Sequence, residues 1–132
     1  KEIRFEPTTG HTPGHVSIHI ESEGEEALIT GDCIHHPCQI EKIEWASSAD
    51  YDQEASTATR HQLMAKYADK DILIIGTHFA TPTAGHLKSN GENYWLDMCR
   101  MWNVPSYIAR CILWDRKQDK TDSRYWSYVL ED

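Results

Sequence analysis

The sequence predicts an α/β fold, and two observations lead to this class. Apolar residues alternate with polar ones at Val16, Ile18 and Ile20, a period of two that is typical of a half-buried β-strand. A segment with helical character, residues 52–67, is followed by the short, largely β-branched run of residues 71–75. A buried strand directly after a helix is the pattern of a sheet covered by helices. We therefore expect a β-sheet with flanking helices.

The first 32 residues predict three neighbouring strands with tight connections. Residues 3–5 form the first strand, residues 16–20 the second and residues 27–30 the third, which ends at a Gly-Asp pair. A Glu-Gly-Glu turn joins the second strand to the third. The histidines of the intervening stretch "TTGHTPGHVSIHI" are four apart, as on one face of a helix. The glycines and the proline among them nevertheless exclude a helix, so this stretch is a turn.

One helix is expected in the middle of the chain, over roughly residues 52–67. Ser47, Ser48 and Asp50 precede it and are candidate N-caps, since their side-chain oxygens can accept hydrogen bonds from the first free N–H groups. The apolar residues of this segment give it a usable but irregular apolar face. The helix should therefore pack against the sheet along one side.

A strand and a hairpin follow the helix. Residues 71–75 predict a buried strand that ends at the sequence "GTHF". Residues 86–96 predict a hairpin, with Asn90-Gly91 as a type I′ turn. We assign residues 1–97 to one domain and residues 98–132, which are rich in tryptophan and carry no motif, to a tail of unknown role.

Composition excludes several classes of protein. The 132 residues are 39% hydrophobic and 26% charged, as in a soluble globular protein, and no apolar run approaches the roughly 20 residues of a membrane span. The net charge of −8 argues against nucleic acid as a partner, because phosphate binding needs a basic surface. The four cysteines have no Cys-x-x-Cys spacing, which indicates neither a cysteine zinc site nor a disulfide framework. We expect a reducing, cytoplasmic environment and no membrane partner.

Polar side chains that suit metal ions gather at the predicted strand ends. The chain has eight histidines, a high number for its length. His15 begins one strand, Asp32 follows another and His78 follows a third. Sites form where the loops at strand ends converge, and imidazole and carboxylate groups are ligands for zinc, manganese or iron. The sequence therefore predicts a metal centre at this edge of the sheet.

Three motifs, "GHTPGH", "TGD" and "GTHF", occur in this order, with 17 residues from His15 to Asp32 and 46 from Asp32 to His78. Together they resemble the second half of the metallo-β-lactamase-fold hydrolases. The resemblance is strongest to the branch that contains lactonases and phosphotriesterase-like esterases. The resemblance covers residues 1–97. It implies the C-terminal half of an αββα sandwich, with a mixed β-sheet and flanking helices.

The resemblance also implies roles for individual residues. His15 would bind the first metal, Asp32 would bridge two metals at the catalytic centre, and His78 would bind the second. Zinc is the expected cofactor, with manganese and iron as alternatives. The family's site holds two metal ions, and we expect at most part of that site in this chain. His19 is expected on the surface, because it alternates with Ile18 and Ile20. Five further residues are expected to support the ligands or to line the pocket: His11, His35, His36, Thr77 and His86.

One hallmark of the family is absent. No two histidines are two apart, so the chain lacks the His-x-His-x-Asp-His motif that supplies the other ligands. We expect a metal-dependent hydrolase of small esters, lactones or phosphoesters that is incomplete in this chain. The alternatives are a non-catalytic half-domain, which binds a separate N-terminal half or self-associates, and a truncated product without a function of its own.

Overall fold

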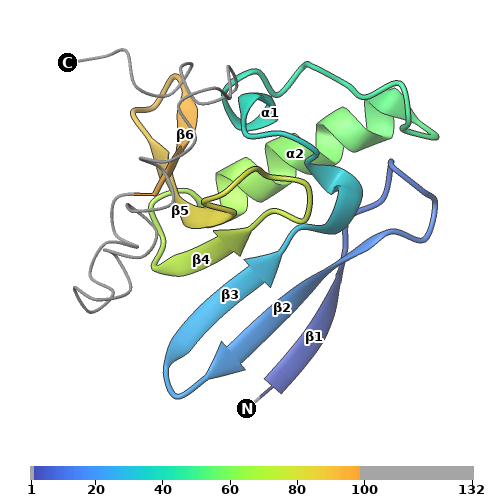
Figure 1. Ribbon diagram of the computed structural model, residues 1–132. Helices are drawn as coiled ribbons and strands as arrows, with labels where there is room; N and C mark the ends of the chain where they lie inside the picture. Colours follow the sequence, from blue (N-terminus) through green and yellow to red (C-terminus); the bar gives the residue numbers. More distant parts are fainter. Residues whose placement is uncertain (1, 99–132) are drawn as a thin grey trace, which may run out of the picture. The chain divides into compact units, whose positions relative to one another are not determined.

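The computed structural model describes residues 2–98, and these form a six-stranded sheet with helices on one face (Figure 1). The strands have the same order in space as in the chain. They are β1 (Glu2–Pro7), β2 (Val16–Ser22), β3 (Glu25–Ile29), β4 (Ile72–Ile75), β5 (Ala84–Ser89) and β6 (Tyr94–Asp97). The predicted tail, apart from residue 98, lies outside the described residues.

The sheet is mixed, as the α/β prediction requires. β3 and β4 are parallel, and every other neighbouring pair is antiparallel. The connection between β3 and β4 holds a 3₁₀ turn, η1 (Gly31–Cys33), the short helix α1 (Cys38–Glu41) and the long helix α2 (Gln53–Tyr67). A parallel pair needs a crossover of this kind. Within residues 2–98, no helix is long and apolar enough to cross a membrane.

The predicted helix is confirmed as α2, but its N-cap is different. The Asp52 carboxylate accepts a hydrogen bond from the Ala55 N–H at 2.9 Å, so none of the predicted candidates Ser47, Ser48 and Asp50 caps the helix. The α2 helix begins directly after Asp52, and a cap must lie within two or three residues of the N–H that it accepts. The predicted candidates lie too far upstream for this role.

The predicted hairpin is confirmed as β5 and β6, but the type I′ turn is wrong. Ser89 pairs with Tyr94, which leaves a loop of four residues instead of two. A type I′ turn needs positive φ at both central residues, and of the Asn90-Gly91 pair only Gly91, with φ of 91°, has it. The Asn90 side chain instead accepts hydrogen bonds from the N–H groups of Glu92 and Asn93.

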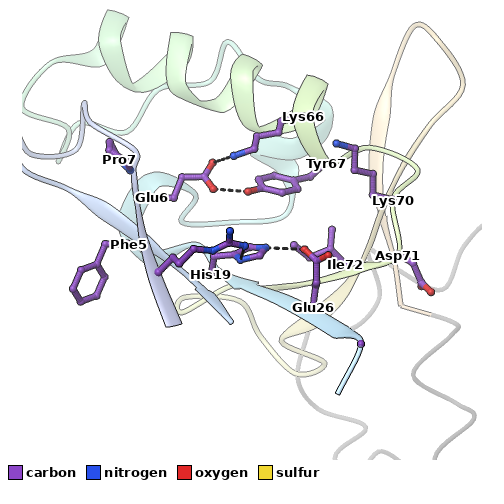
Figure 2. A pocket seen from close by; sticks show the side chains of 12 residues that line it. Phe5, Glu6, Pro7, His19, Glu26, Lys66, Tyr67, Lys70, Asp71 and Ile72 are labelled. Atoms are coloured by element: carbon purple, nitrogen blue, oxygen red, sulfur yellow. Dashed lines mark hydrogen bonds and ion pairs between the residues drawn. The ribbon is translucent and has the colours of Figure 1, made fainter. Parts of the chain in front are cut away.

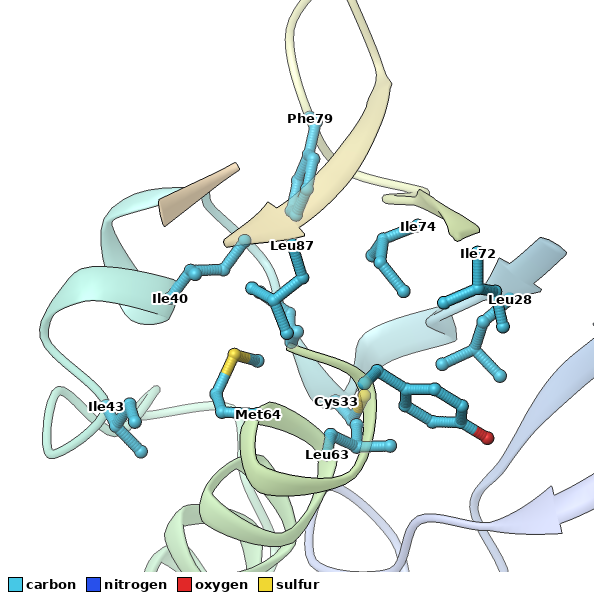
Figure 3. Close-up of a cluster of buried hydrophobic side chains, with 12 residues drawn as sticks. Leu28, Cys33, Ile40, Ile43, Leu63, Met64, Ile72, Ile74, Phe79 and Leu87 are labelled. Atoms are coloured by element: carbon cyan, nitrogen blue, oxygen red, sulfur yellow. The ribbon is translucent and has the colours of Figure 1, made fainter. Parts of the chain in front are cut away.

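The hydrophobic core lies between the sheet and the helices (Figure 3). Leu28, Ile72 and Ile74 come from the central parallel strands, and Leu87 comes from β5. Helix α1 adds Ile40 to the same core. The side chains that α2 contributes are Leu63, Met64 and Tyr67. Both helices therefore cover the same face of the sheet.

His19 lies on this covered face, so the prediction that it is a surface residue is wrong. Its side chain stacks on Tyr67, with ring centroids 6.4 Å apart, and its Nε2 lies 2.9 Å from Glu26 Oε2. The Arg4 guanidinium donates a hydrogen bond to its Nδ1 at 2.8 Å. The alternation of β2 was predicted correctly, but α2 covers the face of the strand that carries His19. The face that carries Ile18 and Ile20 is left uncovered.

The opposite face of the sheet is apolar, and we call it the open face. Phe5 pairs with Ile18, which pairs with Ile29, which pairs with Ile75, so one apolar row crosses four strands. Phe5 is 72% exposed. The same face of β1 to β4 also carries the apolar residues Ile3, Pro7, Val16, Ile20, Ala27 and Leu73. The described helices leave this face uncovered.

A buried cation holds α2 to the preceding loop. Arg60 is fully buried, and its guanidinium donates hydrogen bonds to the Ile43 carbonyl at 3.1 Å and the Ser56 hydroxyl at 2.8 Å. Its Nη1 also lies 3.7 Å from Oδ2 of the buried Asp50. Removing one member of a buried pair leaves the other charge without compensation. The pair therefore fixes the loop that carries Asp50.

We expect Arg60→Ala to lower the free energy of unfolding by about 3–5 kcal/mol, because the Asp50 carboxylate stays buried without its cation. Urea unfolding followed by circular dichroism measures the change. His61→Ala, at the next and exposed position of α2, is the control and should stay within about 0.5 kcal/mol of the unsubstituted chain. Equal stability of the two variants would contradict a structural role for the buried pair.

Candidate metal centre

The ends of β3 and β4 bring Asp32 and His78 together. Because these strands are parallel neighbours, their carboxyl ends lie at the same edge of the sheet, and the "TGD" and "GTHF" sequences follow them directly. His78 Nε2 lies 2.6 Å from Asp32 Oδ1. The Thr77 hydroxyl donates a hydrogen bond to the Gly31 carbonyl at 2.9 Å. Thr77 thus joins the loop that carries His78 to the loop that carries Asp32.

His15 lies beside Asp32, but both of its ring nitrogens are engaged. Nδ1 is 2.9 Å from both the carbonyl oxygen and the hydroxyl of Thr8, and Nε2 accepts a hydrogen bond from the Asp32 N–H at 2.9 Å. A Cβ on Gly31 would lie 2.7 Å from this Nε2, and Gly31 has a φ of +58°. Because Gly31 of "TGD" has no side chain, the His15 ring can lie against the backbone of the Gly31–Asp32 turn.

His11 lies between two carboxylates. Its Nε2 is 3.4 Å from Asp32 Oδ2, and its Nδ1 is 3.2 Å from Asp50 Oδ1. The preceding Gly10 packs against the start of α2, where a Cβ would lie 2.3 Å from Ser56 backbone atoms. The turn predicted from the glycines and proline therefore rests on the helix, and this contact sets the position of His11.

His35 joins the histidines of the cluster. Its ring centroid lies 5.1 Å from that of His11 and 5.3 Å from that of His78. The structure shows two sets of three side chains whose donor atoms lie within 4.8 Å of one another, and His35 belongs to both. These sets are His11–His35–Asp50 and Asp32–His35–His78. His35 is thus the common member of the described donor groups.

The other two predicted pocket residues, His36 and His86, lie outside these groups. His36 is exposed, and its Nδ1 accepts a hydrogen bond from the Cys38 N–H at 3.1 Å. His86 pairs with Leu73 across the sheet, and its Nε2 lies 3.6 Å from Asp71 Oδ1 at the start of β4. The structure therefore does not bring these two histidines together with Asp32.

The electrostatics of the cluster favour the protonation states that bind a metal. The hydrogen bond from His78 holds the pKa of Asp32 below its usual value, and the nearby His11 and His15 act in the same direction. Burial lowers the pKa of His35. Asp32 is thus an anion and His35 is neutral near neutral pH. These are the forms in which the two residues bind metal ions.

Asp50 was not predicted as a site residue. Burial would raise its pKa, but hydrogen bonds from the Ser47 N–H and from His11, together with the charge of Arg60, lower it overall. In the sequence Asp50 has only the position expected of a helix cap. Its contact with His11 joins residues 39 apart in the chain, and no local pattern of residues around Asp50 indicates this contact.

The donor set fits a divalent transition metal. Two imidazoles and a carboxylate, as in Asp32–His35–His78, are the ligand types that zinc, manganese and iron(II) prefer. The side chains of Asp32 and His78 are 43% and 50% exposed. This edge of the sheet is therefore open to a substrate or to solvent.

A cavity lies at the other end of the sheet from the histidine cluster (Figure 2). Its volume is about 670 Å³, and it is lined by residues of β1 to β4 and of the last turn of α2. Lys66 and Tyr67 both donate hydrogen bonds to the Glu6 carboxylate, and His19 contacts Glu26. Because these groups satisfy one another, the cavity is a weaker candidate than the histidine cluster.

Comparison with solved structures supports a hydrolase fold. The chain is similar to "hydrolase AbOPH in beta lactamase superfamily", with 31% identity and a TM-score of 0.67 over 73% of this chain and 34% of that one. It is also similar to AidC, a dizinc quorum-quenching lactonase, with 27% identity and a TM-score of 0.66 over 72% of this chain and 33% of that one. The fold alone is shared with a probable metal-dependent hydrolase from Staphylococcus aureus, with 23% identity and a TM-score of 0.61 over 73% and 35% of the two chains.

The chain spans about one third of the length of these proteins. No curated protein matched the chain. The family profile described as "Metallo-beta-lactamase superfamily" matches residues 1–78, which is more than half of the 132 residues. With the mixed sheet and the histidine cluster at its edge, this match establishes that the chain belongs to the metallo-beta-lactamase superfamily.

Proposed function

We propose that this chain carries part of the metal centre of a hydrolase that cleaves ester, lactone or phosphoester bonds in small molecules. The observation that carries the proposal is the contact of 2.6 Å between Asp32 and His78, at the adjoining ends of two parallel strands. His15, Asp32 and His78 would hold zinc, or manganese or iron in its place. A metal in this position supplies Lewis acidity and lowers the pKa of water.

The chain's own residues would orient the site. His11 contacts the second oxygen of Asp32 at 3.4 Å, which leaves Oδ1 directed at His78. Thr77 holds the two strand-end loops at a fixed separation. Such supporting contacts set ligand orientation, and their loss costs about 10–100-fold in metal affinity or activity in known sites.

The named relatives support a lactone or a similar ester as the substrate. AidC was solved with the product of lactone opening, an N-acyl homoserine. A further relative is an N-acyl homoserine lactone hydrolase, solved with N-hexanoyl-L-homoserine at its metal centre. It shares 28% identity with this chain and has a TM-score of 0.50 over 61% of it. A phosphoester remains the alternative class. The part of each of these proteins that this chain matches is about one third of that protein's length.

We infer that this chain is the C-terminal half of an αββα sandwich and that its site is completed by another segment. The chain contains no His-x-His-x-Asp-His motif. Three ligands are fewer than a dinuclear centre requires. The missing ligands would come from a half-domain that brings its own sheet.

The open face favours a second role, which is assembly with such a half-domain. Ile3 and Phe5 are 69% and 72% exposed, and the apolar row continues across β2, β3 and β4. Exposed apolar patches of this extent mark interaction sites. A second sheet packed on this face, at the usual separation of about 10 Å, would bury the row.

The hydrolase proposal can be tested by complementation. We expect the chain, mixed with zinc and with the complementary part of the AbOPH chain, to hydrolyse N-hexanoyl homoserine lactone or a p-nitrophenyl ester, whereas neither part alone has activity above buffer. Asp32→Ala should lower this activity at least about 100-fold, because it removes a charged ligand.

His61→Ala, which changes an exposed histidine outside the cluster, is the control for this experiment and should leave the activity unchanged. Activity that survives Asp32→Ala would contradict the proposed site. Turnover by the chain alone, lost in Asp32→Ala, would show that the inference of an incomplete site is wrong.

The assembly proposal predicts that the isolated chain self-associates, since a second copy can cover the open face when the partner sheet is absent. Light scattering after size exclusion, at about 100 μM, should show dimers or larger species. Phe5→Glu should shift the chain toward monomer, because burying an unpaired charge in the interface is costly. Tyr51→Glu, at an exposed aromatic residue outside the sheet, should not. A monomer for the unsubstituted chain would contradict the proposal.

A further inference from the structure

We propose that Thr8 and Ser17, which we call the hydroxyl pair, are positioning residues that fix which ring nitrogen of His15 carries its proton. The inference rests on the proposed function, because His15 belongs to the same site. It goes further by assigning a role to two buried side chains for which the sequence predicts none. Thr8 is 1% exposed and Ser17 is 0% exposed, so the pair acts on His15 from the interior of the protein.

Buried hydrogen bonds lead from His15 through the hydroxyl pair to the backbone of β3. His15 Nδ1 lies 2.9 Å from Thr8 Oγ1 and 2.9 Å from the Thr8 carbonyl oxygen. Thr8 Oγ1 lies 3.0 Å from Ser17 Oγ. The Ser17 hydroxyl donates a hydrogen bond to the carbonyl of the buried Thr30 at 3.0 Å. Because these groups are buried, they depend on one another for hydrogen bonds.

The Thr30 carbonyl fixes the direction of these hydrogen bonds at one end. A carbonyl oxygen can only accept, and a hydroxyl has one proton to donate. Since the Ser17 proton points to Thr30, Ser17 Oγ can only accept from the Thr8 hydroxyl. Thr8 Oγ1 then has no proton left for His15, and it can only accept from Nδ1, as the Thr8 carbonyl does. The proton of His15 is therefore on Nδ1.

The Asp32 backbone fixes the same direction at the other end. The Asp32 N–H donates a hydrogen bond to His15 Nε2 at 2.9 Å, and this requires a nitrogen without a proton. The two ends therefore demand the same tautomer of His15, with the proton on Nδ1 and the lone pair on Nε2.

Cys33 does not compete for the hydroxyl pair. Its sulfur lies 3.8 Å from Ser17 Oγ, and its thiol donates to the Thr30 carbonyl at 3.1 Å. A carbonyl oxygen has two lone pairs, so it accepts from both Cys33 and Ser17. The buried thiol thus leaves the direction of the hydroxyl pair unchanged.

The tautomer fixed in this way is the one that the proposed site needs. An imidazole binds a metal through the nitrogen that has no proton, and the hydrogen bond of the other nitrogen decides which one this is. His15 Nε2 is the nitrogen on the side of Asp32. Nε2 would give up the Asp32 N–H on binding a metal, and the hydroxyl pair with the Thr8 carbonyl would then alone keep the proton on Nδ1.

Two-bond ¹H–¹⁵N correlation spectra of the 132-residue chain, with ¹⁵N-labelled histidine and no added metal, test the inference. The nitrogen that carries the proton and the nitrogen that carries the lone pair resonate far apart. At a pH of about 8.5, imidazoles with the usual pKa of about 6.5 are neutral. We expect a protonated Nδ1 and an unprotonated Nε2 for His15. A proton on Nε2 would overturn the inference without the need for any variant.

Ser17→Ala removes the acceptor of the Thr8 hydroxyl, so the Thr8 proton can turn toward His15. We expect the Nδ1 resonance to move toward that of an unprotonated nitrogen. Adding Thr8→Val removes this hydroxyl as well and should return the resonance to its original position, because the backbone carbonyl still accepts from Nδ1. A merely structural role of the pair would not give this reversal.

Two further variants are the controls for these spectra. Thr8→Ser keeps the hydroxyl, and Ser89→Ala removes a hydroxyl of the β5–β6 hairpin that bonds the Gly91 N–H. Both should leave the His15 resonances in place, and circular dichroism confirms that each variant is folded. Resonances that do not move in Ser17→Ala, or that stay shifted when Thr8→Val is added, would overturn the inference.

The complementation experiment tests whether the fixed tautomer matters for the reaction. Ser17→Ala should lower the activity about 10–100-fold, as the loss of residues that orient a ligand does in known sites, and Thr8→Ser should retain it. Unchanged activity in a variant whose tautomer has shifted would overturn the positioning role. Absence of activity in every sample would contradict the proposed function, while the spectra would still decide the tautomer of His15.

Discussion

The parallel pairing of β3 with β4 is the constraint on which the candidate site depends. A parallel pair places two carboxyl ends at one edge of the sheet, and here those ends carry Asp32 and His78. An antiparallel pair would put the same residues at opposite edges. The pairing requires a crossover, and α2 provides it by packing Leu63 and Met64 on the strands. Core packing and site geometry are therefore consequences of the same arrangement.

The crossover also supplies contacts that a strand pair alone does not have. The buried Arg60 of α2 lies next to Asp50, and Asp50 contacts His11 from the first turn of the chain. His11 in turn contacts Asp32. A continuous set of polar contacts thus leads from the helix interior to the edge of the sheet. Each charge in this set has a partner, which is the condition for keeping such groups buried.

The two faces of the sheet differ in whether the described helices cover them. One face packs on α1 and α2 and includes the buried His19, which is paired with Glu26 and Arg4. The open face is more uniformly apolar on β1 to β4 and yet carries the exposed Phe5. A face that is apolar but uncovered by the described helices is understandable in a chain that spans about one third of its relatives.

By itself the sequence determined the class of fold, a helix over roughly residues 52–67 and the strand ends where polar side chains gather, because these follow from local periodicity and turn chemistry. It could not decide which side of β2 is covered, since alternation is symmetric and only the position of α2 shows that His19 is inside. The cap at Asp52 and the four-residue hairpin loop depend on backbone angles that several residue types tolerate. The sequence predicted His35 as a pocket residue, but its ring contact with His78, and the contact of His11 with Asp50, were decided by tertiary structure. These contacts join residues about 40 apart, and only the crossover and the packing of the turn on α2 bring them into reach.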